Sequence, residues 1–161
     1  MVACERRSAN LSLKTRLNDD LKTAMRSRDV LRRSVLRLVL SAVHNEEIAE
    51  QAELDDEGIT GVLGKQAQQR RESIEAYTQG ERQDLADKEK AELEIIMSYL
   101  PEQMSREDIA AVVKRAIAET GAAGPQDMGK VMSRVMPEVR GKAQGREVNA
   151  IASELLKGAG A

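Results

Sequence analysis

The stretch LRRSVLRLVLSAVHNEE, residues 31–47, indicates which class of fold the chain adopts. Its apolar side chains recur every three or four residues, which is the spacing of one face of an α-helix and not the alternation of a β-strand. Charged side chains fill the positions between them, so the helix also has a polar face. We expect this helix to continue to about residue 51. The apolar stripe consists of Leu31, Val35, Leu38 and Ala42.

The amino-acid composition also favours helices packed on helices. The 161 residues contain no Phe, no Trp and two Tyr, yet 41% of them are apolar. The core must therefore consist of Leu, Val, Ile, Met and Ala. A sheet protein normally draws on aromatic as well as β-branched side chains, so the composition argues against an all-β fold. It also argues against a nucleic-acid binder that stacks bases on aromatic rings.

Signals for helix ends divide the chain into further helices. About four helices are expected in the first part, delimited by a polar segment at 26–29, a cap at Asp55-Asp56, the pair Gln79-Gly80 and Pro101. Ser105 and Asp108 then form a variant capping box, in which Asp takes the place of the usual Glu or Gln. This motif predicts that a new helix starts there.

The last part of the chain is expected to hold three short helices. Gly124-Pro125 opens the second of them, with Pro at a permitted first-turn position. Pro137 is expected to end that helix and Gly158 to end the last one. The sequence thus predicts an all-α protein. Its expected parts are a disordered leader at 1–10, an N-terminal helical domain at 11–101 and a small three-helix C-terminal domain at 102–161.

The overall charge and the cysteine content suggest a compartment and exclude some partners. The chain has 25 Lys and Arg against 27 Asp and Glu, a net charge of −2, which is not the balance of a general polyanion binder. No apolar run approaches the roughly 18 residues of a membrane span. Cys4 is the single cysteine, so no disulfide framework can form within the chain. We expect a cytoplasmic protein with no membrane partner and no DNA partner.

The sequence shows no arrangement of residues that is typical of catalysis or metal binding. His44 is the single histidine, and one histidine with one distant cysteine cannot make a zinc site of the His/Cys type. The stretch GITGVLGKQ, 58–66, resembles a phosphate-binding loop but has Ile59 and Gln66 at two of the required positions. We therefore predict no catalytic residue, no metal and no cofactor.

Basic residues gather in two blocks. The first, 14–37, carries eight bases against three acids and is interpreted as solvated helix faces. The second lies in the tail, where Lys130, Arg140, Lys142 and Arg146 lie at helix ends and in a glycine-rich loop. Such a loop before a helix can present cations and backbone N–H groups to phosphates. The alternative, that the glycines only make the turn, stays open.

Three motifs resemble the YqeY family when taken together and in order. They are SYLPEQMS at 98–105, DMGKVM at 127–132 and VMPEVRGKAQGREVN at 135–149. The N-terminal stretch 12–48 fits the YqeY form in particular, so the resemblance covers about 12–158. The family is related to the C-terminal tail of GatB, the subunit of the glutamyl/aspartyl-tRNA amidotransferase that holds tRNA.

The resemblance implies an all-α fold in two helical parts and a link to tRNA. The family's label as a carbon–nitrogen ligase with glutamine as amide donor is not taken as an activity, because this chain shows no nucleophile or nucleotide loop. Two positions depart from the family pattern, Ser133 where Gly is common and Gln144 where Asp is common. The candidate RNA-binding cations are Lys130, Arg134, Arg140, Lys142 and Arg146, and the candidate loop glycines are Gly129, Gly141 and Gly145.

Two functions follow as hypotheses. The first is a non-catalytic accessory module that binds structured RNA through phosphate contacts, with tRNA or a tRNA-handling protein as partner. The second is a protein-interaction or assembly module without RNA affinity, in which Met128, Met132 and Met136 would meet an apolar partner. Their spacing of four also fits a buried helix stripe.

Overall fold

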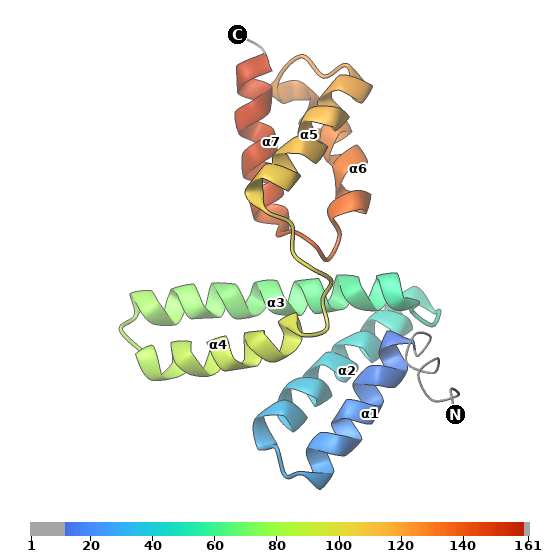
Figure 1. Cartoon of the computed structure of the whole chain (residues 1–161), viewed down its shortest axis with the longest axis vertical. Coiled ribbons are helices and arrows are strands. Elements are labelled where there is room, and N and C mark those ends of the chain that lie inside the picture. The colour runs from blue at the N-terminus through green and yellow to red at the C-terminus, as the bar shows by residue number, and fades with distance from the viewer. Residues whose placement is uncertain (1–11, 160–161) are drawn as a thin grey trace, which may run out of the picture. The chain divides into compact units, whose positions relative to one another are not determined.

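The structure is a computed structural model that describes residues 12–159, and this part of the chain is entirely helical apart from turns and loops (Figure 1). The predicted all-α fold class is confirmed. The predicted disordered leader, with Cys4, lies outside the described residues. The elements are α1 (Leu13–Arg26), α2 (Val30–Glu50), α3 (Asp56–Gln79), α4 (Gln83–Met97), α5 (Arg106–Thr120), a short 3-10 helix η1 (Pro125–Asp127), α6 (Met128–Val139) and α7 (Gly145–Ala159).

The residues group by their contacts in space into two compact units, Met1–Tyr99 and Leu100–Ala161. The predicted boundary after residue 101 lies close to this division. That each unit folds as an independent domain stays a prediction.

The N-terminal unit consists of two helical hairpins, α1 with α2 and α3 with α4 (Figure 1). Short polar side chains start the helices, because each accepts a hydrogen bond from a first-turn backbone N–H that has no partner within the helix. Ser12 accepts from the N–H of Thr15 at the start of α1. Asp29 and Asp55 cap α2 and α3 in the same way.

Aliphatic side chains fill the core of the N-terminal unit, as the composition predicts. The largest fully buried ones are Leu17, Leu36, Ile59, Leu63 and Ile96.

A single aromatic ring joins the end of α4 to α1. Tyr99 is 6% exposed, and its hydroxyl donates a hydrogen bond of 2.5 Å to Asp20 Oδ2. The guanidinium of Arg16 lies 4.9 Å from the ring centre, in cation–π geometry. Burial first, and then the contact with Asp20, raises the pKa of Tyr99 to about 12. The phenol therefore stays protonated as a hydrogen-bond donor at neutral pH.

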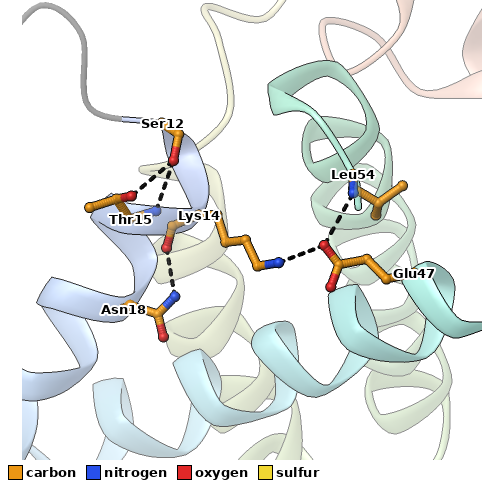
Figure 2. A network of polar contacts seen from close by, with 6 residues as sticks. All are labelled: Ser12, Lys14, Thr15, Asn18, Glu47 and Leu54. Carbon is orange, nitrogen blue, oxygen red and sulfur yellow. Dashed lines mark hydrogen bonds and ion pairs between the residues drawn. The ribbon is translucent and has the colours of Figure 1, made fainter. Parts of the chain in front are cut away.

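A polar network fastens the start of α1 to the far end of α2 (Figure 2). Lys14 Nζ lies 2.6 Å from Glu47 Oε1, and the same oxygen accepts a hydrogen bond of 3.1 Å from the N–H of Leu54. The N–H of Leu13 donates to Asp56 Oδ1 at 2.8 Å. The start of α1, the end of α2 and the start of α3 thus meet at one polar cluster.

This cluster predicts how stability depends on pH. The hydrogen bond from Lys14 lowers the pKa of Glu47, so its contribution is present above about pH 4.5 and is lost as the pH falls through the folded-state value. Glu47 in turn raises the pKa of Lys14, whose contribution is lost only as the pH rises past about 10.5. We expect Glu47→Gln to reduce the free energy of unfolding at neutral pH and to flatten its decline in acid. Urea unfolding followed by circular dichroism at several pH values measures both.

The control for this prediction is Glu94→Gln, because Glu94 is an exposed glutamate on α4. The free energy of unfolding of this variant should fall in acid as much as that of the wild type. If the free energy of unfolding fell equally with pH in the wild type and in Glu47→Gln, the role given to Glu47 would be contradicted.

The C-terminal unit packs α5, α6 and α7 around a small aliphatic core. The capping box predicted at its start is present, because Ser105 and Asp108 each accept the other's backbone N–H. The buried side chains that close the core come from all three helices. Those with less than 2% exposure are Ile109, Val113, Val131, Val135, Val139, Val148, Ala152 and Leu156.

Two expected helix boundaries differ from the structure. Pro137 does not end its helix, because α6 continues to Val139. Proline lacks one N–H, but in the last turn this loss removes a single hydrogen bond and leaves the earlier turns intact. Gly158 does not end its helix either, because it is the last residue but one of α7. Gly124-Pro125, in contrast, opens η1, which leads into α6. The helix pattern was predicted well, but its exact ends were not.

Candidate nucleic-acid interface

The predicted phosphate-binding residues all lie in the C-terminal unit, and three of them lie close together, two in the loop between α6 and α7 and one in the first turn of α7. Arg140, Lys142 and Arg146 are exposed and fall within seven residues. Gly141 has a φ of 74°, a left-handed conformation that glycine adopts without strain. Glycine therefore suits the turn at this position, and both the phosphate-binding interpretation of the loop and its alternative stay predictions. The other two candidate glycines lie in helices, Gly129 in α6 and Gly145 at the start of α7.

The segment before α5 braces this loop. The N–H of Met104 donates to the carbonyl of Lys142 at 2.7 Å, and Gln103 Nε2 donates to the carbonyl of Gly141 at 2.8 Å. Within the loop, the N–H groups of Lys142 and Ala143 both donate to the carbonyl of Val139. The backbone that carries the cations is therefore held by hydrogen bonds on two sides, which reduces the entropy lost when a ligand binds.

The two other candidate cations lie on α6 and are paired with carboxylates. Lys130 Nζ lies 3.3 Å from Asp127 Oδ1, and Arg134 Nε lies 2.7 Å from Glu119 Oε2. Lys130 precedes Arg140 by ten residues, or about 15 Å along a helix. The structure therefore separates Lys130 from the loop, at the opposite end of α6.

Glu138 lies between the loop cations and Arg134. Its pKa is lowered first by a hydrogen bond from Arg115, and the positive charges of Lys142 and Arg134 lower it further. An open groove of about 460 Å³ between α5 and α6 has Arg115, Arg134 and Glu138 in its lining. Arg115, Arg134 and Lys142 thus act on Glu138, and the ion pairs of Arg115 with Glu138 and of Arg134 with Glu119 offset part of the positive charge.

The arrangement has the chemistry needed to hold an anion. Guanidinium and ammonium groups on a braced loop are suited to phosphate oxygens. In residues 12–159 no cluster of three His, Cys, Asp or Glu side chains could hold a metal ion.

Sequence reasoning missed the residues that act on the loop from other helices. Gln103 lies 38 residues before Gly141, and Arg115 lies 23 residues before Glu138. Neither pair has a local spacing signal, because both depend on how α5 packs against α6 and the loop. The nearest signal was the motif SYLPEQMS, which contains Gln103 and Met104 but was noted only as part of a resemblance.

Comparison with known proteins places the chain in a family. Residues 14–156 match the family model of YqeY, described as Yqey-like protein. The protein named "Altered inheritance of mitochondria protein 41, mitochondrial" from Lachancea thermotolerans is 36% identical over 68% of this chain. Its namesakes from Kluyveromyces lactis and Pyrenophora tritici-repentis are 34% and 31% identical over 75% and 80% of this chain. The match spans 70% and 71% of these two relatives. It spans 60% of the Lachancea protein and 46% of the one from Vanderwaltozyma polyspora.

The names of these relatives contradict the expected cytoplasmic location. Each is called a mitochondrial protein, which points to mitochondria rather than to the cytoplasm. The prediction was wrong because the lack of a disulfide framework separates reducing from oxidising compartments and does not tell one reducing compartment from another. The match over 14–156, together with the helical structure of that region, shows that the chain belongs to the YqeY family.

Proposed function

We propose that the chain is a non-catalytic accessory module that binds structured RNA, tRNA in particular, through phosphate contacts of the loop after α6. The observation that carries the proposal is the placement of Arg140, Lys142 and Arg146 on a seven-residue segment whose backbone Gln103 and Met104 brace. Contacts of this kind read the shape of an RNA and not its bases, so they need no aromatic ring.

The net charge of the C-terminal unit limits how tightly the loop can bind RNA by itself. From 100 to 159 the chain has nine Lys and Arg against eight Asp and Glu. Because phosphate contacts supply most of the affinity of such sites, a unit this close to neutral binds RNA weakly by itself. The module therefore works beside a tRNA-handling protein that supplies the rest of the affinity.

The double variant Lys142→Glu with Arg146→Glu tests the proposal. We expect it to weaken the binding of bulk tRNA at low salt by at least about tenfold, because it removes two phosphate contacts and adds two repulsive charges. Glu138→Gln should strengthen binding, since it removes a negative charge beside Lys142. A fluorescence titration with labelled tRNA measures each dissociation constant.

The matched control is Lys114→Glu with Lys157→Glu, which makes the same change in net charge at exposed positions of the same unit. If this control and the loop variant lose equal affinity, the loop has no special role. Circular dichroism establishes that both variants keep their helices.

The alternative function is a protein-interaction module without RNA affinity. One observation favours it, which is that Met136 is 38% exposed at the surface. Met128 and Met132, in contrast, pack partly buried against the core of the unit. Capture of a protein partner that survives nuclease treatment, together with no binding of tRNA, would support this alternative.

A further inference from the structure

The tip of the α1–α2 hairpin carries a group of arginines without acidic partners. Arg26 ends α1, Arg28 lies in the turn, and Arg33 and Arg37 follow on α2. None of the four forms an ion pair with another residue of the described 12–159. We call these four arginines, with the apolar side chains beside them, the arginine tip. Its apolar members are Met25 and Val30.

Local geometry keeps these cations together, and three of them are exposed while Arg33 is half-buried. Val30, Arg33 and Arg37 occupy positions i, i+3 and i+7 of α2 and so share one helix face. From 21 to 45 there is one acid, Asp29, and its carboxylate accepts the backbone N–H of Arg32 as the cap of α2. The nearest carboxylate in the sequence is thus engaged in capping.

Two large apolar side chains flank the same turn. Met25 is 50% exposed and Val30 is 62% exposed. Scattered single apolar residues on a surface need no explanation. These two differ because they lie on either side of a projecting turn and among four guanidinium groups.

The rest of the N-terminal unit is acidic, in contrast to the arginine tip. Outside 21–45, residues 12–99 contain eight bases and seventeen acids, and the segment 46–57 alone has seven acids and no base. Within 21–45 there are six bases against one acid. Such a separation of charge turns the tip toward a negatively charged surface and keeps the acidic end of the unit away from it.

We propose that the arginine tip docks the protein reversibly on an anionic lipid surface. The guanidinium groups bind headgroup phosphates, and Met25 and Val30 enter the boundary between headgroups and acyl chains. RNA phosphates would use the cations but would leave the apolar pair without a role, which favours lipid. The described part of the chain has no helix that is long and apolar enough to cross a bilayer. The proposed contact is peripheral, and it differs from the expectation of no membrane partner, which stays untested.

Flotation of the full chain with lipid vesicles tests this proposal. We expect binding to vesicles of equal parts phosphatidylcholine and phosphatidylglycerol, little binding to phosphatidylcholine alone, and a loss of binding as salt increases. Arg26→Ala with Arg28→Ala should weaken binding roughly 25-fold, since each basic residue near such a surface contributes about fivefold. Met25→Ser with Val30→Ser should also weaken binding but leave its salt dependence unchanged.

The control is Lys88→Ala with Lys90→Ala, which removes two exposed positive charges from α4 of the same unit. It should bind mixed vesicles as the wild type does. No binding to mixed vesicles, or equal binding by the wild type and the Arg26/Arg28 variant, would overturn the proposal. Loss of tRNA affinity in the arginine variant, with no effect of the serine variant on vesicles, would assign the tip to RNA instead. The lipid proposal does not depend on the RNA proposal, because the two concern different surfaces.

Discussion

Replacing Leu156 with alanine is expected to destabilise the C-terminal unit strongly while the stability of the N-terminal unit stays unchanged. Leu156 has no exposed surface and lies in the core formed by α5, α6 and α7. Removing a buried leucine side chain costs about 3 kcal/mol, and a unit of this size without aromatic side chains has little stability to spare. Urea unfolding followed by circular dichroism should show two transitions in the variant, of which only one is shifted to lower urea.

Leu38→Ala is the matched control, because it makes the same chemical change at a leucine that is 52% exposed on α2. We expect it to change the free energy of unfolding by less than about 0.5 kcal/mol. A single transition that shifts as a whole in Leu156→Ala would show that the two units unfold together and would contradict their independence.

Replacing Arg70 with alanine is expected to cost about 3 kcal/mol of stability in the N-terminal unit. Arg70 Nε lies 3.1 Å from Glu92 Oε2, and its terminal nitrogen lies 3.5 Å from Glu89 Oε2. The three side chains are only 10–16% exposed, so removing the arginine leaves two poorly solvated carboxylates without a counter-charge. Neither Arg70 Nε nor Glu89 Oε2 has a hydrogen-bond partner of good geometry, so charge rather than directed bonding holds the group.

A triple variant separates the loss of a partner from the net contribution of the group. Arg70→Met, Glu89→Met and Glu92→Leu together keep the volume and remove all three charges. We expect its free energy of unfolding to lie within about 1 kcal/mol of the wild type, because the cost of desolvating the ions disappears with their attraction. Equal, large losses in the single and triple variants would contradict this explanation.

The helices could be predicted from the sequence because their signals are local. The apolar stripe from Leu31 and the capping box of Ser105 and Asp108 each lie within one helix or one turn. Pro137 was misjudged because the effect of a proline depends on how near the helix end it lies, which spacing does not give. The ion pairs Lys14–Glu47 and Arg70–Glu92 join residues more than twenty positions apart. They follow from helix packing, which leaves no local pattern.

The candidate interface was predictable to the same extent. Arg140, Lys142 and Arg146 lie within seven residues of one another, so the sequence could group them. Two ion pairs between α5 and α6, Arg134 with Glu119 and Arg115 with Glu138, could not be read from the sequence. Sequence reasoning therefore overestimated how much free positive charge α6 presents. It also treated the first basic block as ordinary solvated faces, whereas the structure gathers part of it at one tip.

Titration of folded tRNA with the wild-type protein over a range of salt concentrations tests the central claim most directly. We predict that the protein binds tRNA at micromolar concentration in low salt. We also predict a linear fall of log K with log salt concentration, with a slope of about −2 to −3 for the three loop cations. The Lys142→Glu, Arg146→Glu variant should reduce the size of this slope by about 2. No binding at micromolar protein in low salt, or binding with no dependence on salt, would contradict the claim.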